Sequence, residues 1–300
     1  MNTFRPACQL IGAGRAGRAL AMAMSRVGYH FTWIGSKHGK EACRLAKQIG
    51  VRNCGIGVEG LAGTAEFLII AVPDDEIVRV ASEALAAGVI THDTIAAHLS
   101  GALPSNILGD MRAVGAAVMA FHPSQTFTPE SDPEMVFHTI CFDIEGDHGA
   151  CALGECIAQD LGATSIRLTP QQRILSHLAM TVASNYTVSI IHMAEEIMMS
   201  ADIPGEVAQK MLLPLFLNTA HNIATFGTLT ALTGPVSRGD DAIIRKHLSV
   251  LDSYEDTYKN VYTALGRIAL RMAVKRGDVS GTKAEEIIKL LEKWKDTNIQ

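Results

Sequence analysis

The chain has 300 residues, of which 48% are hydrophobic and 19% charged, so it carries enough apolar surface to build folded cores and is not a disordered chain. Its net charge of −5 and the lack of a basic run exclude nucleic acid as an expected partner, because phosphate binding needs clustered cations. No uninterrupted apolar stretch approaches the ~20 residues of a membrane helix, and we recognise no secretory signal. We therefore expect a cytoplasmic protein with no membrane partner.

The first half of the chain alternates short apolar runs with Ala-rich amphipathic segments. Strands are predicted at residues 8–11, 30–34, 67–72, 94–99, 116–120, 138–142 and 164–168. Strands separated by helical segments indicate βαβ units and a mostly parallel sheet. We predict an α/β parallel-sheet domain over residues 1–167, in agreement with a length of roughly 150 residues per domain.

After Pro170 the hydrophobic pattern is helical throughout. Helices are predicted at residues 171–200, 206–226, 240–250, 252–275 and 283–295. They indicate an all-α C-terminal domain over residues 168–300. Because no flexible linker precedes it, we expect the first long helix to pack directly on the sheet domain.

The cysteines form no C-x-x-C pair and have no histidine at zinc-finger spacing, so we expect no metal site. We predict small buried thiols in a reducing compartment, because free cysteine behaves as a small core residue. The six positions are Cys8, Cys43, Cys54, Cys141, Cys151 and Cys156.

A G-x-G-x-x-G motif lies between the first predicted strand and an Ala-rich helix. Gly12 permits the tight turn, Gly14 lets the backbone approach a pyrophosphate, and Gly17 lets the helix pack on the sheet. The alternative is an ordinary glycine turn. We predict a Rossmann-type dinucleotide-binding domain whose helix N-terminus faces the phosphates. The predicted binding residues are Gly12, Ala13, Gly14, Arg15, Ala16 and Gly17.

The end of the second strand indicates which dinucleotide is bound. An NAD site usually has Asp or Glu there to bind the ribose hydroxyls, whereas this strand is followed by Ser36 and Lys37. Ser36 can hydrogen-bond a 2′-phosphate, and Lys37, with Arg15, can neutralise it. The alternative is a solvated loop. We predict NADP as the cofactor in preference to NAD.

Three polar loops follow later strands and should share one rim, since the carboxyl ends of parallel strands meet at one edge of the sheet. Val72, Pro73 and Asp74 are predicted to lie under the nicotinamide ribose, although Asp74 or Asp75 also suits a helix N-cap. The other two loops contain Ser100 and His122. We predict that they contact the substrate.

The helix predicted after Pro170 has a polar stripe at i, i+4 and i+8, formed by His177, Thr181 and Asn185. Hydride reduction of a carbonyl creates an alkoxide that needs a proton, and histidine can supply it near neutral pH. We predict these three as catalytic residues, with the substrate between the two domains. The alternative is a hydrogen-bonded core histidine.

A second polar cluster, residues 233–240, is predicted to form a turn. Arg238 could clamp a substrate carboxylate, or could face solvent as part of a structural turn. Asp240 is predicted to cap the next helix.

Five motifs together resemble one family over nearly the whole chain: GAGRAG at 12–17, AVPDD at 71–75, HLSGA at 98–102, FHPSQTF at 121–127 and LTGPVSRGD at 232–240. These are bacterial proteins with a Rossmann-like domain and a helical C-terminal domain of unknown function. They are candidate NADP oxidoreductases by analogy with the deazaflavin-dependent enzyme. The layout is also similar to ketopantoate reductase, pyrroline-5-carboxylate reductase and 3-hydroxyisobutyrate dehydrogenase. The resemblance implies NADP-dependent reduction of a small carbonyl or imine compound, and a homodimer formed through the helical domains.

One position departs from these relatives. Ketopantoate reductase and the hydroxyisobutyrate enzymes have a catalytic Lys one helical turn before an Asn; Asn185 matches the Asn, but Thr181 occupies the Lys position. Either His177 substitutes, or the site no longer performs that reaction. A non-catalytic NADP-binding sensor or regulatory protein is therefore the competing hypothesis. A third is a subunit that uses an apolar stripe of Ile287, Ile288, Leu291 and Trp294, which we expect instead to dock on the helical domain or a dimer partner.

Overall fold

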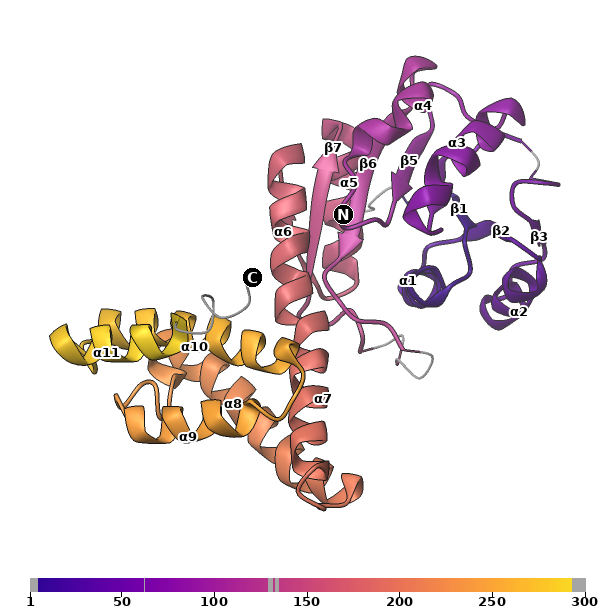
Figure 1. Cartoon of the computed structure of the whole chain (residues 1–300). Coiled ribbons are helices and arrows are strands. Elements are labelled where there is room, and N and C mark those ends of the chain that lie inside the picture. The colour runs from indigo at the N-terminus through magenta and orange to yellow at the C-terminus, as the bar shows by residue number, and fades with distance from the viewer. Residues whose placement is uncertain (1–4, 62, 129–131, 133–134, 293–300) are drawn as a thin grey trace, which may run out of the picture. The chain divides into compact units, whose positions relative to one another are not determined.

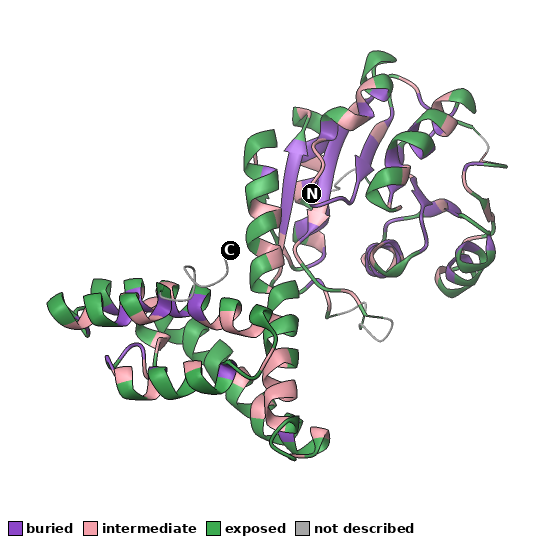
Figure 2. Ribbon diagram, viewed as in Figure 1, coloured by how far each residue is buried: buried purple, intermediate pink, exposed green. Residues whose placement is uncertain are grey.

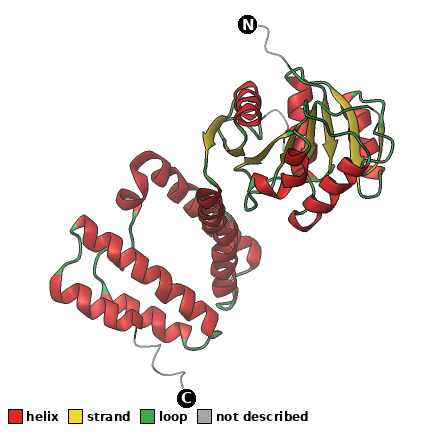
Figure 3. Cartoon of the chain, turned by 90° about the horizontal axis from the view of Figure 1, so that it is seen from above, coloured by secondary structure: helices red, strands yellow, loops and turns green. Residues whose placement is uncertain are grey.

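The computed structural model describes residues 5–61, 63–128, 132 and 135–292. By its internal contacts the chain divides into two compact units, Met1–Tyr186 and Thr187–Gln300, and each is described by itself. The first unit alternates strands with helices, whereas the regular elements of the second are helices (Figure 3). The α/β and all-α classes predicted from the sequence are confirmed, and the boundary after residue 167 stays a prediction.

The first unit contains an eight-stranded sheet in the order β3-β2-β1-β4-β5-β6-β7-β8 (Figure 1). Neighbouring strands are parallel except β6 and β7, which are antiparallel. The strands are β1 Cys8–Ile11, β2 Phe31–Ser36, β3 Cys54–Ile56, β4 Phe67–Ile70, β5 Ile95–His98, β6 Ala117–Pro123, β7 Cys141–Gly146 and β8 Thr164–Arg167. The mostly parallel sheet is therefore confirmed, with one short edge strand, β3, that the sequence pattern did not indicate.

Helices cover both faces of this sheet. They are α1 Arg15–Arg26, α2 Lys40–Ile49, α3 Ile77–Ala86, α4 Gly109–Ala113, α5 His148–Asp160 and α6 Pro170–Ala183, with 3₁₀ turns η1 Asp74–Glu76 and η2 Ser105–Leu108. Side chains of α1, α2 and α5 pack in one core, and those of α3, η2 and α4 in a second. The strands between them are largely buried (Figure 2). Such sandwiching explains why the central strands are continuous apolar runs.

The helix that begins at Pro170 packs on the sheet domain, as the sequence predicted, and contacts β7. Thr169 starts it with a capping box, in which its hydroxyl accepts from the Gln172 N–H. The α-helical pattern ends at Ala183 and begins again at Asn185 in α7 (Asn185–Met199). The structure therefore has two helices where the sequence predicted one continuous helix over residues 171–200.

The stretch Pro170–Met199 is long and apolar enough to cross a membrane, by length and composition only. Core helices of soluble proteins pass the same test. Arg173 in its first turns pairs with a sheet carboxylate, Asp143, which attaches this end of the stretch to the sheet. The absence of a membrane partner stays a prediction.

The helices of the second unit are the rest of α7, α8 Gly205–Ala231, α9 Asp241–Leu251, α10 Asp256–Arg276 and α11 Gly281–Glu292. Side chains of α9, α10 and α11 form a small core. Asp240 caps α9 through the Ile243 N–H at 3.1 Å, as predicted. Ile287 and Leu291 of α11 are buried in this core, so that part of the apolar stripe docks within the helical unit; Trp294 lies outside the described residues.

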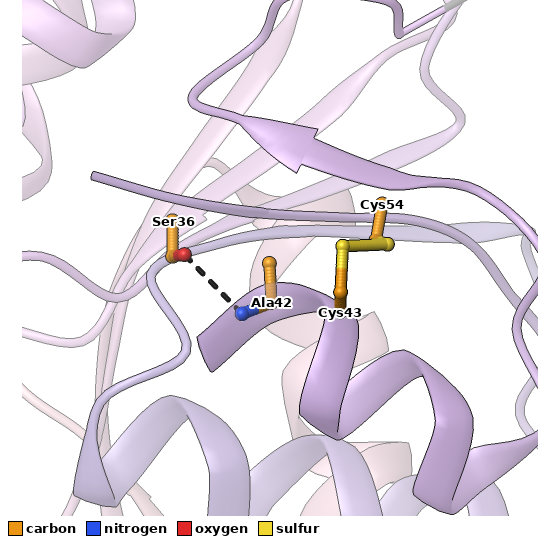
Figure 4. The surroundings of a disulfide bond; sticks show 4 residues. All are labelled: Ser36, Ala42, Cys43 and Cys54. Carbon is orange, nitrogen blue, oxygen red and sulfur yellow. Dashed lines mark hydrogen bonds between the residues drawn. A yellow bond between two sulfur atoms is a disulfide. The ribbon is translucent and has the colours of Figure 1, made fainter. Parts of the chain in front are cut away.

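Two sequence predictions are wrong in this structure. Cys43 on α2 and Cys54 on β3 form a disulfide with Cα atoms 5.2 Å apart (Figure 4), so these two are not free thiols. Cys156 is free but exposed, whereas Cys8 and Cys151 are buried as expected. Neither Asp74 nor Asp75 caps a helix by its side chain, because Pro73 and Glu76 occupy the cap positions of η1 and α3.

Candidate functional site

The glycine loop connects β1 to α1 at the carboxyl edge of the sheet. Gly12 has a φ of +112°, and a Cβ there would lie 2.1 Å from the Ala71 carbonyl oxygen. A Cβ on Gly17 would lie 2.1 Å from the Gly12 carbonyl oxygen. These two glycines are thus required for the turn to pack against the end of β4. Gly14 is different, since a Cβ there meets no atom within 4 Å.

The open space at Gly14 adjoins the N-terminus of α1. No side-chain hydrogen bond caps this helix, and Gly14 is its N-cap residue. Uncapped N–H groups and the helix dipole together favour a bound anion. The loop therefore has the features that a pyrophosphate requires, with Ala13, Arg15 and Ala16 as its remaining members.

A cavity of about 680 Å³ lies at the carboxyl ends of β1, β2, β3 and β4. It is lined at these four ends by Ile11, Ser36, Ile56 and Val72. This is the edge at which open parallel sheets bind ligands. Pro73 follows Val72 in the lining, so two of the three residues predicted under the nicotinamide ribose border the cavity.

The cavity contains both cations and carboxylates. Lys37 Nζ lies 3.8 Å from a Glu76 carboxylate oxygen, and Arg79 Nε lies 2.5 Å from the other. The Arg79 hydrogen bond lowers the pKa of Glu76, with Lys37 contributing less. Lys37 is thus available to a phosphate, but Glu76 competes for it.

Ser36 is the last residue of β2 and is 6% exposed. Its hydroxyl oxygen accepts a hydrogen bond from the Ala42 N–H at 3.2 Å (Figure 4). Its own hydrogen stays available to a phosphate oxygen, since a hydroxyl both accepts and donates. Ser36 therefore joins the start of α2 to the cavity wall.

The loops after β4 and β5 are connected by a hydrogen bond from Ser100 Oγ to Asp74 Oδ2 of 2.9 Å. The same Ser100 oxygen accepts from the Ala102 and Leu103 N–H groups at 3.2 and 3.1 Å. The hydroxyl therefore fixes the loop in this structure. Direct contact of Ser100 with a substrate stays a prediction.

His122 and His177 face each other across Gly101. The ring centroids are 6.3 Å apart and the planes are inclined at 72°. A Cβ on Gly101 would lie 2.7 Å from His177 Cδ2 and 2.8 Å from His122 Nε2, so any other residue would require the rings to shift. The structure thus brings together two residues that the sequence placed on separate elements, a strand end and a helix.

The hydrogen bond of His122 defines its tautomer. Its Nδ1 is 3.0 Å from the Leu99 carbonyl oxygen, which only accepts, so Nδ1 carries the hydrogen and Nε2 is bare in the neutral ring. Burial lowers the pKa of His122, and the negative charge of Asp143 partly offsets this. A neutral His122 accepts a hydrogen bond at Nε2 on the side facing Gly101.

Arg173 stabilises the loop after β5 by hydrogen bonds to its backbone. It is 0% exposed, and its guanidinium donates to Asp143 Oδ1 at 2.6 Å, to the Leu103 carbonyl at 3.1 Å and to the Ser100 carbonyl. Burial raises the pKa of Asp143, whereas Arg173 and then His122 oppose the rise. Asp143 Oδ2 has no hydrogen-bond partner within the described part of the chain. One cation thus joins α6, β7 and the loop after β5.

Sequence reasoning missed Arg173 and Asp143, although each left a signal. Arg173 lies four residues before His177, so the polar stripe begins one turn earlier than the three residues identified. Asp143 and Glu145 alternate with buried Phe142 and Ile144 along β7, which indicates charges on one face of a buried strand.

The other predicted site residues are less constrained. Thr181 is half-buried on α6, one turn beyond His177, and Asn185 is exposed at the first position of α7. Arg238 belongs to the second unit and is exposed in a turn. Their catalytic and substrate-binding roles stay predictions.

Comparisons with known families agree with this architecture. Residues 1–123 match the Rossmann-like domain, and residues 140–269 match a domain of unknown function, DUF2520. The chain thus has a region similar to each of these two domains, in the order that its sequence motifs predicted. Among proteins with curated descriptions, none matches it in sequence.

Solved structures similar to the chain include oxidoreductases. BF3122 of Bacteroides fragilis, a candidate NADP oxidoreductase, is 25% identical with a TM-score of 0.72, over 89% of this chain and 98% of its own. A pyrroline-5-carboxylate reductase of Coxiella burnetii is 17% identical with a TM-score of 0.58, over 95% and 99%. An imine reductase of Myxococcus stipitatus, solved with NAD+, is 16% identical with a TM-score of 0.58, over 95% and 99%. For the pyrroline-5-carboxylate reductase and the imine reductase, the similarity to this chain shows a shared fold.

The buried imidazole of His98, the last residue of β5, generates a prediction about stability. Burial lowers the pKa of His98 to about 4 from an ordinary value of 6.5, and its Nδ1 accepts from the Ser100 N–H. Between these values the unfolded chain binds a proton that the folded chain does not, so stability falls as pH drops from 6.5 toward 4. The expected loss by pH 4.5 is about 2 kcal/mol.

Urea unfolding of the wild type and of His98→Gln at pH 7 and pH 4.5 measures this contribution. We expect His98→Gln to lose less stability between the two pH values than the wild type does. His92→Gln is the control, because the His92 side chain is 79% exposed. Equal losses in the wild type and His98→Gln would contradict the assignment.

Proposed function

We propose that this protein is an NADP-dependent oxidoreductase that transfers hydride between NADP(H) and a small carbonyl or imine compound. The observation that carries the proposal is the shared edge of the sheet. The glycine loop and the 680 Å³ cavity lie at the carboxyl ends of β1 to β4, and His122 lies at the carboxyl end of β6. A nicotinamide bound there supplies or accepts the hydride, and the chain supplies binding, orientation and the proton.

The glycine loop fits the pyrophosphate, because Gly14 leaves an open approach to the uncapped start of α1. At the other end of the cofactor, the Ser36 hydroxyl and the Lys37 ammonium suit a 2′-phosphate. No carboxylate ends β2, although Glu76 lies beside Lys37. NADP is accordingly the proposed cofactor, with NAD less favoured.

His177 and His122 suit different parts of the proton chemistry. Neutral His122 has a bare Nε2 and accepts a hydrogen bond from a substrate N–H or O–H. His177 is half-buried and has no hydrogen-bond partner that would fix it as an acceptor among the described residues, so we assign it the proton transfer. Thr181 and Asn185 follow on the same polar stripe, and Asn185 would orient the substrate. Arg238 would bind a substrate carboxylate.

A non-catalytic NADP-binding sensor is the second candidate. Thr181 stands where the resembled dehydrogenases have a catalytic Lys, and the Ser100 hydroxyl is fully used in fixing its loop. Both observations favour a site that binds the nucleotide without reducing a substrate.

The second unit supports a homodimer. Large apolar side chains of α8 are exposed in the single chain, among them Met211, Leu215, Leu217 and Phe226 at 57–64%. A cavity of about 370 Å³ in the same unit is lined by apolar side chains of α7 and α10. Exposed apolar surface of this kind marks a protein interface. We propose that a second copy of the chain covers it.

Nucleotide titration tests the cofactor. We expect NADPH to bind more tightly than NADH, and Lys37→Ala to weaken NADPH binding by about 10-fold while NADH binding stays unchanged, because only NADPH has the 2′-phosphate. Lys47→Ala is the matched control, since Lys47 is exposed on α2 and does not line the cavity. Tighter binding of NADH, or an equal effect of Lys37→Ala on both nucleotides, would overturn the NADP assignment.

Turnover tests the proton transfer. With a substrate found in a panel of aldehydes, keto acids and imines, His177→Ala should lower kcat by about 10²- to 10⁴-fold while the NADPH affinity is retained. His192→Ala is the control, because the His192 side chain is 66% exposed on α7. Unchanged turnover of His177→Ala would remove this residue from the mechanism. NADPH binding without oxidation across the panel would favour the sensor.

A further inference from the structure

The disulfide between Cys43 and Cys54 joins α2 to β3, the strand whose carboxyl end borders the proposed cofactor cavity. Cys54 is the first residue of β3, a three-residue strand at the edge of the sheet that pairs with β2. The last residue of this strand, Ile56, and the next, Gly57, line the cavity. The bond connects β3 to α2 two residues before the cavity-lining end of the strand (Figure 4).

The other cysteine of the disulfide, Cys43, is next in sequence to the residue that hydrogen-bonds Ser36 in the proposed phosphate site. Cys43 follows Ala42, whose N–H donates to Ser36 Oγ. Ser36 in turn is paired with Ile56 in the β2–β3 register. The disulfide and the hydrogen bond of Ser36 thus both connect α2 to the paired strands β2 and β3.

Non-covalent interactions also hold this wall. The Gly57 N–H donates to the Ser36 carbonyl at 3.0 Å, and Trp33 Nε1 donates to the Gly57 carbonyl at 3.1 Å. Both attach the wall to β2. The disulfide is the covalent connection between β3 and α2, so breaking it removes one constraint on their relative position and leaves their packing contacts.

Chemical access differs among the cysteines. Cys43 is an exposed residue and Cys54 is half-buried, so the pair lies at the surface of the sheet domain. Burial raises the pKa of the Cys8 thiol to about 12 and also raises that of Cys151, so these two are poor nucleophiles for exchange. Cys156 is exposed but lies on α5 and serves as a matched control.

We propose that Cys43 and Cys54 form a redox-active pair whose disulfide state favours NADPH binding. A dithiol reductant attacks one sulfur as its thiolate, which breaks the Cys43–Cys54 bond and forms a mixed disulfide. The second thiol of the reductant then displaces the protein sulfur. Two electrons and two protons pass from the dithiol to the pair, the dithiol becomes a disulfide, and glutathione disulfide reverses the change.

This inference rests on the proposed nucleotide site and makes it responsive to redox conditions. Reduction loosens the position of Ser36, which would bind only the 2′-phosphate, so NADPH binding weakens more than NADH binding. Linkage requires the reverse effect of equal size, because bound NADPH must make the disulfide harder to reduce by the same factor.

Thiol counting and nucleotide titration of the full chain test the proposal. After treatment with glutathione disulfide and removal of the reagent, the denatured protein should show four reactive thiols, and six after reduction with dithiothreitol. We expect reduction to raise the Kd for NADPH by roughly 5-fold or more, with a smaller change for NADH. Cys43→Ser and Cys54→Ser should each bind NADPH like the reduced wild type, with or without dithiothreitol, whereas Cys156→Ser should keep the redox response.

The outcomes separate this inference from the proposed function. Six reactive thiols in the oxidised sample, or the same NADPH affinity in both redox states, would overturn the redox-active pair. NADH binding reports whether a Cys43→Ser or Cys54→Ser variant has kept its nucleotide site. Failure of both nucleotides to bind in either redox state would contradict the proposed cofactor and the coupling, whereas counts of four and six would still support the pair.

Discussion

The buried guanidinium of Arg173 is the interaction on which the candidate site depends. Removing its charge from water costs several kcal/mol, which only well-placed partners can offset. Those partners are Asp143 on β7 and the carbonyls of Ser100 and Leu103. Because the partners come from separate elements, Arg173 fixes the loop after β5 relative to α6. The same loop carries Gly101, which separates the two histidine rings.

Neighbouring strand ends of the sheet carry different groups of candidate site residues. The ends of β1 and β2 carry the glycine loop and Ser36, where we propose that a nucleotide binds, and the ends of β5 and β6 carry Ser100 and His122, the predicted substrate contacts. Parallel strands make this division possible, since their carboxyl ends meet at one edge. The disulfide near Ser36 adds a covalent constraint on the nucleotide side of the proposed site. On the same side, the Glu76 carboxylate offsets the positive charge of Lys37.

Local patterns predicted much of this arrangement. β1 has the bounds that its apolar run indicated, the glycine motif forms the predicted strand-to-helix turn, and His177 lies on the predicted helix. The pairing of Arg173 with Asp143 was not predictable, because it joins residues 30 positions apart through tertiary packing. β3 is short and has a central glycine, so it gives no strand signal. The Cys43–Cys54 spacing likewise matches no recognised motif.

Unfolding of Arg173→Leu, compared with Arg167→Leu, tests the central role of the buried cation most directly. Arg167 is an exposed arginine paired with Glu155, and its loss should cost little stability, because solvent screens exposed ion pairs. Arg173→Leu leaves the Asp143 carboxylate buried without its cation, and we predict a loss of roughly 3–5 kcal/mol in the free energy of unfolding. A loss no larger than that of Arg167→Leu would contradict the account.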